Sequence, residues 1–60
     1  MRINELDVVR LTDGREGTVV LAYPGERAFC VEIADSDGQT LDLVDAEERE
    51  IAAVIWRAGS

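Results

Sequence analysis

The sequence predicts a small all-β domain of five strands, and three observations support this prediction. Short runs of β-branched and aliphatic residues recur along the 60 residues, and turn-forming residues separate them. Between 29 and 33 the largest apolar residues occupy every second position, which is the period of a half-buried strand. Gly14 and Gly17 bracket the connection between the first two runs, as expected where the chain turns sharply. Because a chain this short supports one hydrophobic core, residues 1–60 are expected to form a single domain.

The first two strands are expected at 6–11 and 18–23, where valine and other β-formers are concentrated. The Thr-Asp-Gly sequence at 12–14 has the chemistry of a turn. Gly17 is expected at a bulge or tight corner through which the chain enters the second strand. A Pro-Gly pair at 24–25 then predicts the turn that ends this strand.

The third and fourth strands are expected at 27–34 and 40–44, on either side of an Asp-Gly hairpin turn at 37–38. Alternation along both strands predicts which side chains point into the core: Phe29, Val31, Ile33, Leu41 and Leu43. Thr40 and Asp42 are expected to point to solvent.

Residues 46–57 allow two interpretations. In the first, Asp45 caps a short helix and Glu48 completes a capping box. Three apolar residues would then share one helical face: Ile51, Val54 and Ile55. In the second, a 3₁₀-like turn at 45–48 precedes a fifth strand at 50–56. The strand is preferred because its residues are β-formers and because the sheet needs a strand to cover its open edge.

The composition is strongly acidic, with 13 acidic and 6 basic residues, a formal net charge of -7, and no lysine. This charge disfavours generic binding to nucleic-acid phosphates, which requires a basic face, and suits a protein partner with a basic surface. No segment approaches the length of a membrane span or of a signal-peptide core, so no membrane association is expected. A cytoplasmic location is expected because Cys30 has no second cysteine to pair with.

The residues required for common catalytic and metal sites are missing from the sequence. Histidine is absent, and Cys30 has no neighbouring base that would activate it, so we interpret it as a small filler of the sheet. The Asp-Ser-Asp-Gly sequence at 35–38 lacks the remaining ligands of a calcium loop, and the glycines form no phosphate-binding motif. We therefore expect no enzyme activity, no metal and no cofactor.

The segment 35–50 is the most acidic part of the chain, with seven acidic residues and one arginine. Four of its carboxylates are expected to form an acidic lobe that steers a basic partner: Asp42, Asp45, Glu47 and Glu48. The alternative is a solvated segment whose charges provide solubility and compensate a helix dipole.

The expected strands at 18–23 and 50–56 are apolar on both faces, although a strand with one solvated face should alternate. If the even-numbered residues of the first of these strands point inward, its odd-numbered residues point outward. The exposed patch expected from this apolar surplus consists of Leu21, Tyr23, Val54 and Trp56. The alternative is that bent strands and the chain ends cover these residues.

The order of strands and turns is that of SH3-like barrels, and the chain resembles a family of short bacterial proteins known as a domain of unknown function, DUF4926. The resemblance covers about two thirds of the chain, on Leu6-Asp7-Val8-Val9, Gly14, Gly17-Thr18-Val19-Val20, Tyr23, Val31-Glu32-Ile33 and Asp37-Gly38-Gln39-Thr40-Leu41. The chain departs from the family in a shorter loop after the first strand and in Leu21, where relatives often carry a charged residue. The resemblance implies a small five-stranded SH3-like barrel and no activity.

These observations predict a non-catalytic protein-binding module, such as an antitoxin, an immunity protein or another inhibitor of a basic partner. One alternative is a homodimer or other homo-oligomeric structural module that uses the same apolar patch. Another is a nucleic-acid-binding barrel of the KOW type, acting through Arg10, Arg15 and Arg27, which the net charge disfavours.

Overall fold

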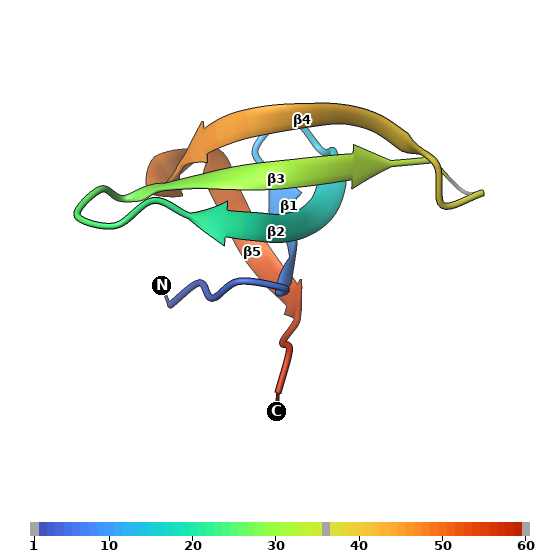
Figure 1. Cartoon of the computed structure of the whole chain (residues 1–60). Helices are drawn as coiled ribbons and strands as arrows, with labels where there is room; N and C mark the ends of the chain where they lie inside the picture. Colours follow the sequence, from blue (N-terminus) through green and yellow to red (C-terminus); the bar gives the residue numbers. More distant parts are fainter. Residues whose placement is uncertain (1, 36, 60) are drawn as a thin grey trace.

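Five antiparallel strands form a single sheet in the computed structural model, which describes residues 2–35 and 37–59. In chain order the elements are β1 (Val8–Leu11), β2 (Glu16–Ala22), β3 (Ala28–Ala34), β4 (Thr40–Glu47), the 3₁₀ turn η1 (Glu48–Glu50) and β5 (Ile51–Trp56). Their order across the sheet is β4-β3-β2-β1-β5, so β4 and β5 are its two edges (Figure 1). No helix in the described residues is long and apolar enough to cross a membrane.

The prediction of an all-β domain with five strands is confirmed, and within the described residues the sheet is open, because no strand pairing joins β4 to β5. Figure 1 shows β2, β3 and β4 as long curved strands, with β1 and β5 running across them. The core contains residues from every strand and from the segment before β1: Ile3, Val9, Leu11, Val19, Val31, Ile33, Ala46 and Ile51. Phe29, Val44 and Val54 are half-buried against it.

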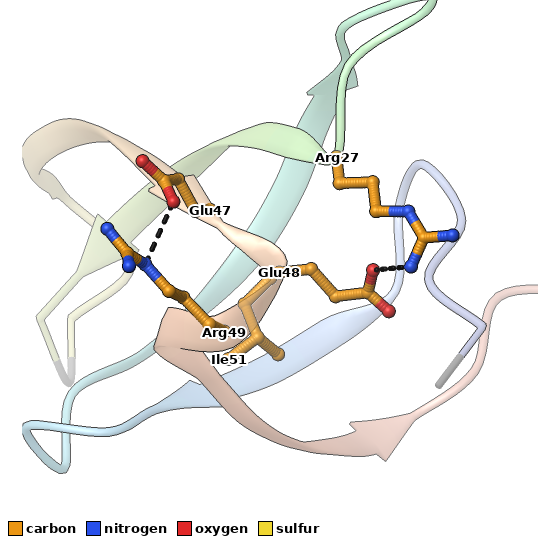
Figure 2. A pocket seen from close by; sticks show the side chains of 5 residues that line it. All are labelled: Arg27, Glu47, Glu48, Arg49 and Ile51. Carbon is orange, nitrogen blue, oxygen red and sulfur yellow. Dashed lines mark hydrogen bonds and ion pairs between the residues drawn. The ribbon is translucent and has the colours of Figure 1, made fainter.

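The chain after β4 forms a turn and a strand, so the helical interpretation of residues 46–57 is wrong. β5 pairs with β1 from Leu11–Ile51 to Val8–Trp56, and this pairing satisfies backbone groups that a helix would satisfy internally. The capping box predicted for Asp45 is also wrong, because Asp45 lies within β4. Glu50 accepts a hydrogen bond from the N–H of Glu47 instead, at 3.0 Å, in the turn drawn in Figure 2.

The prediction for β3 is confirmed, and that for β4 is wrong. Val31 and Ile33 are buried, but Leu41 and Leu43 are 65% and 58% exposed. The cause is the register, which places Val44 opposite Val31 and therefore moves Leu43 to the other face of the sheet. Thr40 and Asp42 are exposed, as predicted.

An irregularity in β2 overturns the predicted directions of its side chains. Val19 is opposite Val31 and fully buried, so the odd-numbered residues do not all point outward. The register shifts between Val19 and Leu21, which leaves Val20 without a directly opposite residue on β3. Leu21 is opposite Cys30, on the face away from the core, as a β-bulge would cause.

Gly17 occupies a position on the core side of the sheet where a side chain has no room. It is opposite both Val9 and Ile33. A Cβ at this position would collide with the carbonyl oxygen of Glu32 and would lie 2.8 Å from Cγ1 of Val31 and 2.9 Å from Cδ1 of Ile33. Glycine is therefore required here by the close approach of β3.

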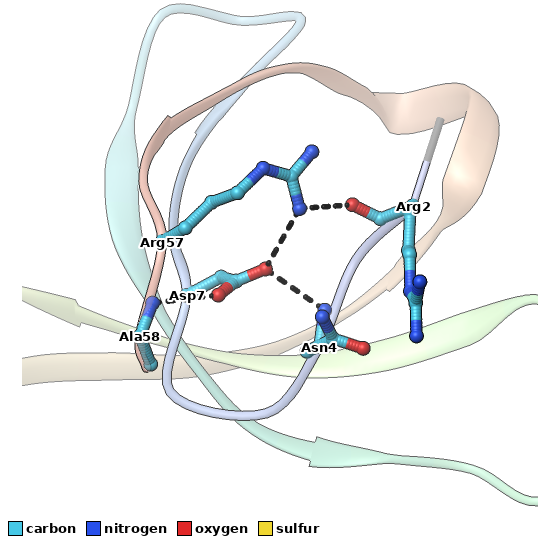
Figure 3. A network of polar contacts seen from close by, with 5 residues as sticks. All are labelled: Arg2, Asn4, Asp7, Arg57 and Ala58. Atoms are coloured by element: carbon cyan, nitrogen blue, oxygen red, sulfur yellow. Dashed lines mark hydrogen bonds and ion pairs between the residues drawn. The ribbon is translucent and has the colours of Figure 1, made fainter. Parts of the chain in front are cut away.

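Asp7 is fully buried and joins the two ends of the chain (Figure 3). Its Oδ2 accepts a hydrogen bond from the N–H of Asn4 at 2.9 Å, and its Oδ1 accepts one from the N–H of Ala58 at 2.9 Å. Arg57 places Nη1 3.7 Å from Oδ2 and donates from the same nitrogen to the carbonyl of Arg2. The bond from Asn4 lowers the pKa of Asp7 below 3.8, and Ala58 and Arg57 act in the same direction against the effect of burial.

Asp7→Asn is expected to lower the free energy of unfolding by about 2 kcal/mol at neutral pH, because the amide nitrogen would face a backbone donor. Folding lowers the pKa of Asp7, so its contribution is present above the ordinary pKa of 3.8 and is lost as the pH falls below it. Urea unfolding at several pH values should therefore show a smaller loss of stability in acid for Asp7→Asn than for the wild type. The exposed Asp37→Asn is the control, and equal acid sensitivity of Asp7→Asn and the wild type would contradict the assignment.

Gly17→Ala is expected to cost about 2–3 kcal/mol of stability, because β3 must move to admit the methyl group. Gly14→Ala is the comparison: its Cβ would meet nothing within 4 Å, and only its φ of +94° opposes the substitution, at about 1 kcal/mol. Thermal or urea unfolding measures both. Equal costs would show that close packing is not what selects glycine at position 17.

Candidate protein-binding face

The side of β2, β3 and β4 that faces away from the core brings together apolar and acidic side chains. Cross-strand pairing places Leu21 opposite Cys30, and Cys30 opposite Asp45. In the neighbouring row Glu32 is opposite Leu43. We define the outer face by six of the residues on this side: Leu21, Cys30, Glu32, Leu43, Asp45 and Glu47.

The outer face combines apolar and acidic side chains, with Leu21 and Leu43 on the two strands that flank β3. Leu21 is 42% exposed and Leu43 is 58% exposed, while Cys30 between their strands is half-buried. Glu32, Asp45 and Glu47 supply three carboxylates, and the face as defined contains no basic residue. The face is therefore complementary in chemistry to a surface that carries apolar and basic groups.

A hydrogen bond holds β4 to the end of β2 across β3. The hydroxyl of Tyr23 donates to Oδ1 of Asp45, and the two oxygens are 2.6 Å apart. This hydrogen bond, together with burial and the negative charge of Asp45, raises the pKa of Tyr23 to about 12. Tyr23 thus orients one carboxylate of the outer face.

Two open grooves lie beside this face, between the β2–β3 hairpin and η1. The larger, of about 540 Å³, is lined by Arg27, Glu47, Glu48, Arg49 and Ile51 (Figure 2). Nη1 of Arg27 lies 3.4 Å from Oε2 of Glu48, and Nε of Arg49 lies 2.9 Å from Oε2 of Glu47. The second groove, of about 410 Å³, shares Arg27 and Glu47 with the first. Both arginines are largely exposed, so these ion pairs add little stability.

The structure does not bring together the four residues of the predicted apolar patch. Leu21 lies on the outer face and Tyr23 is half-buried beside it. Val54 is half-buried against the core, opposite Val9, so the prediction that it lies in an exposed patch is wrong. Trp56 is 59% exposed but lies on β5, at the other edge of the sheet. Register shifts on both sides of the Val9–Val54 and Arg10–Ala53 pairs reset the alternation along β5.

The predicted acidic lobe is also divided. Asp45 and Glu47 lie on the outer face, whereas Asp42 is opposite Ile33 on the other side of β4. Glu48 belongs to η1 and pairs with Arg27. The sequence predicts Leu43 in the core, so its place on the outer face could not be recognised from the sequence. The sequence signal for its position is that Val44 and Ala46 in the same strand are also apolar and occupy the alternate positions, so either set could point to the core.

The arginines considered for nucleic-acid binding each pair with a carboxylate. The pairs are Arg10 with Glu16 at 3.1 Å, Arg15 with Asp13 at 2.8 Å and Arg27 with Glu48 at 3.4 Å. In the part of the chain that the structure describes, no group of three or more cysteine, aspartate or glutamate residues is arranged to hold a metal ion.

Comparison with known protein families identifies the family of this chain. The model of a family described as "Domain of unknown function (DUF4926)" matches residues 3–53. No curated protein and no solved structure matches the chain significantly. The resemblance noted from the sequence is confirmed at the level of the family.

Asp45→Asn is expected to lower the pKa of Tyr23 from about 12 toward the ordinary value of about 10, because the hydrogen bond loses its charged acceptor. Since folding raises this pKa, the bond stabilises the fold below pH ~10 and is lost as the pH rises through the raised value. Tyr23 is the only tyrosine, so the ultraviolet absorbance of its phenolate reports it alone. Asp42→Asn, on the same strand, should leave the midpoint unchanged, and an unchanged midpoint in Asp45→Asn would refute the assignment.

Proposed function

Since the chain belongs to the DUF4926 family, a domain of unknown function, we propose from its surface that it is a non-catalytic module that binds a protein with a basic surface. The observation that carries this proposal is the outer face, where exposed Leu21 and Leu43 lie among three carboxylates. Exposed apolar side chains beside polar and charged ones are common in protein interfaces.

Electrostatics favours a basic partner over other occupants of the outer face. The formal net charge of -7 attracts a basic protein at long range, and Glu32, Asp45 and Glu47 offer ion-pair partners at contact. Two copies docked through this face would instead place these carboxylates against each other, and like charges in contact are unfavourable. A different protein is therefore the preferred occupant over a second copy.

The fold supports the same proposal. The strand order and the 3₁₀ turn before β5 are those of an SH3-like barrel, and we propose that this domain is a member of that class. An acidic module of this kind that covers a basic cleft would act as an inhibitor, in the manner of an antitoxin or immunity protein. A reducing compartment such as the cytoplasm suits the unpaired Cys30.

The pairing of Arg10, Arg15 and Arg27 with carboxylates argues against the KOW-type alternative. A phosphate backbone would have to displace these partners against the net negative charge of the chain. We therefore do not propose nucleic-acid binding.

The immobilised protein is expected to capture a basic protein from a lysate of its source organism, and raised salt should weaken the capture. Leu21→Glu and Leu43→Glu should each reduce the capture at least about tenfold, because each replaces an exposed apolar side chain of the outer face with a charge. Ile55→Glu is the matched control, because Ile55 on β5 is 40% exposed and Leu21 is 42% exposed.

Equal capture by all four proteins would refute the outer face as the binding surface. Analytical ultracentrifugation tests whether a second copy of the chain occupies the outer face instead. A wild-type dimer at micromolar concentration that Leu43→Glu dissociates would assign the face to a second copy and overturn the proposal.

A further inference from the structure

The ladder between β3 and β4 shows which backbone groups of β4 point away from the sheet. The N–H of Glu48 donates to the carbonyl of Arg27 at 2.8 Å, which sets the phase of the alternating hydrogen-bonded and non-hydrogen-bonded pairs. The non-hydrogen-bonded pairs are then Ala28–Glu47, Cys30–Asp45 and Glu32–Leu43. The N–H and C=O groups of the three β4 residues therefore point outward, along the edge of the sheet.

Side-chain carboxylates hold two of these outward donors. Oδ1 of Asp42 accepts the N–H of Leu43 at 2.9 Å, and Oε1 of Glu50 accepts the N–H of Glu47 at 3.0 Å. Both bonds are local and solvent-exposed, so another acceptor can replace them at little cost. They also confirm independently that these N–H groups point away from β3.

We propose that β4 is a strand-addition site, at which an extended segment of the partner with alternating basic and apolar residues joins the sheet. Carbonyl groups of the segment accept the N–H groups of Leu43, Asp45 and Glu47, while its basic side chains pair with the carboxylates of Asp45 and Glu47 on the outer face. This inference rests on the proposed function and specifies the mode by which the partner binds.

The two sides of β4 determine how basic and apolar residues alternate along the partner segment. On the outer face the added strand lies beside Asp45 and Glu47, which favour basic residues. On the other side it lies beside Val44, which is half-buried, and Ala46, which is buried, so apolar residues there extend the core. Because side chains of a strand point alternately to the two faces, basic and apolar residues must alternate.

The same carboxylates exclude a second copy from this edge. Pairing β4 with β4 would bring Asp42, Asp45 and Glu47 of both chains close together, and like charges on neighbouring strands are destabilising. Charged edges of this kind prevent self-association in β proteins. The edge therefore discriminates by charge, repelling its own sequence and accepting a basic one.

The probe is a capped peptide of alternating arginine and valine, titrated into the isotope-labelled protein and followed by NMR. The amide signals of Leu43, Asp45 and Glu47 are expected to shift and to become protected from exchange. A peptide of the same composition, with its arginines and valines in separate blocks, should bind at least about tenfold more weakly. N-methylation of alternate residues of the alternating peptide, on the edge that pairs with β4, should weaken binding by a similar factor. It blocks the backbone hydrogen bonds with β4 and keeps the charge of the peptide.

Leu43→Pro tests the protein side, since it removes an outward N–H that β3 does not use, and proline is tolerated at such positions of edge strands. It is expected to weaken binding about as much as N-methylation, whereas Leu43→Ala, which keeps the donor, should weaken it less. Circular dichroism checks that both variants fold, and the N-methylated peptides decide the question if Leu43→Pro does not fold.

Absence of peptide binding, or binding that is indifferent to N-methylation, would overturn strand addition. Binding that is indifferent to N-methylation but lost in Leu21→Glu would overturn it while leaving the outer face as the docking surface. The failure of the two proposals is thus distinguishable, because the outer face is tested by Leu21 and the edge by backbone donors.

Discussion

The buried carboxylate of Asp7 is the interaction on which the arrangement of the chain ends depends. It accepts hydrogen bonds from the backbone N–H groups of Asn4, before β1, and Ala58, after β5. Because Asp7 directly precedes β1, these bonds hold both segments to the start of that strand. A buried charge is destabilising unless donors surround it, and here two backbone donors and Arg57 do so. With one cysteine the chain cannot form an internal disulfide, and a core this small leaves little margin. Asp7 performs the fastening that a cross-link performs in many small domains.

Leu21 lies on the outer face because β2 is irregular. A regular strand would have kept Leu21 on the side of Val19, which is fully buried. The register shift between them turns Leu21 outward, onto the same side as Leu43. Gly17, two residues before Val19, allows β3 to approach closely enough for this register to hold. The candidate binding surface is thus a product of backbone geometry in β2 as much as of its apolar residues.

Acidic side chains serve two purposes at the β4 edge. Asp42 and Glu50 satisfy backbone donors that an edge strand leaves unpaired, and the negative charge opposes pairing with another copy. Asp45 adds a third contact, since its bond with Tyr23 ties the edge strand to the end of β2. Because these local hydrogen bonds are exposed and replaceable, the edge remains available to a partner whose basic side chains pair with Asp45 and Glu47. This combination links the acidity of the chain to the proposed selectivity for a basic partner.

The sequence by itself determined the first four strands, the turns between them and the buried residues Val31 and Ile33 of β3, and it left residues 46–57 open between a helix and a fifth strand. These features depend on turn chemistry and period-two alternation, which act within a few neighbouring residues. The face of β4 was decided by tertiary structure, because Leu41 and Leu43 compete with Val44 and Ala46 in the same strand and only the register with β3 selects between them. The division of the predicted patch and acidic lobe has the same origin, since register shifts in β2 and β5 depend on partner strands that are distant in sequence.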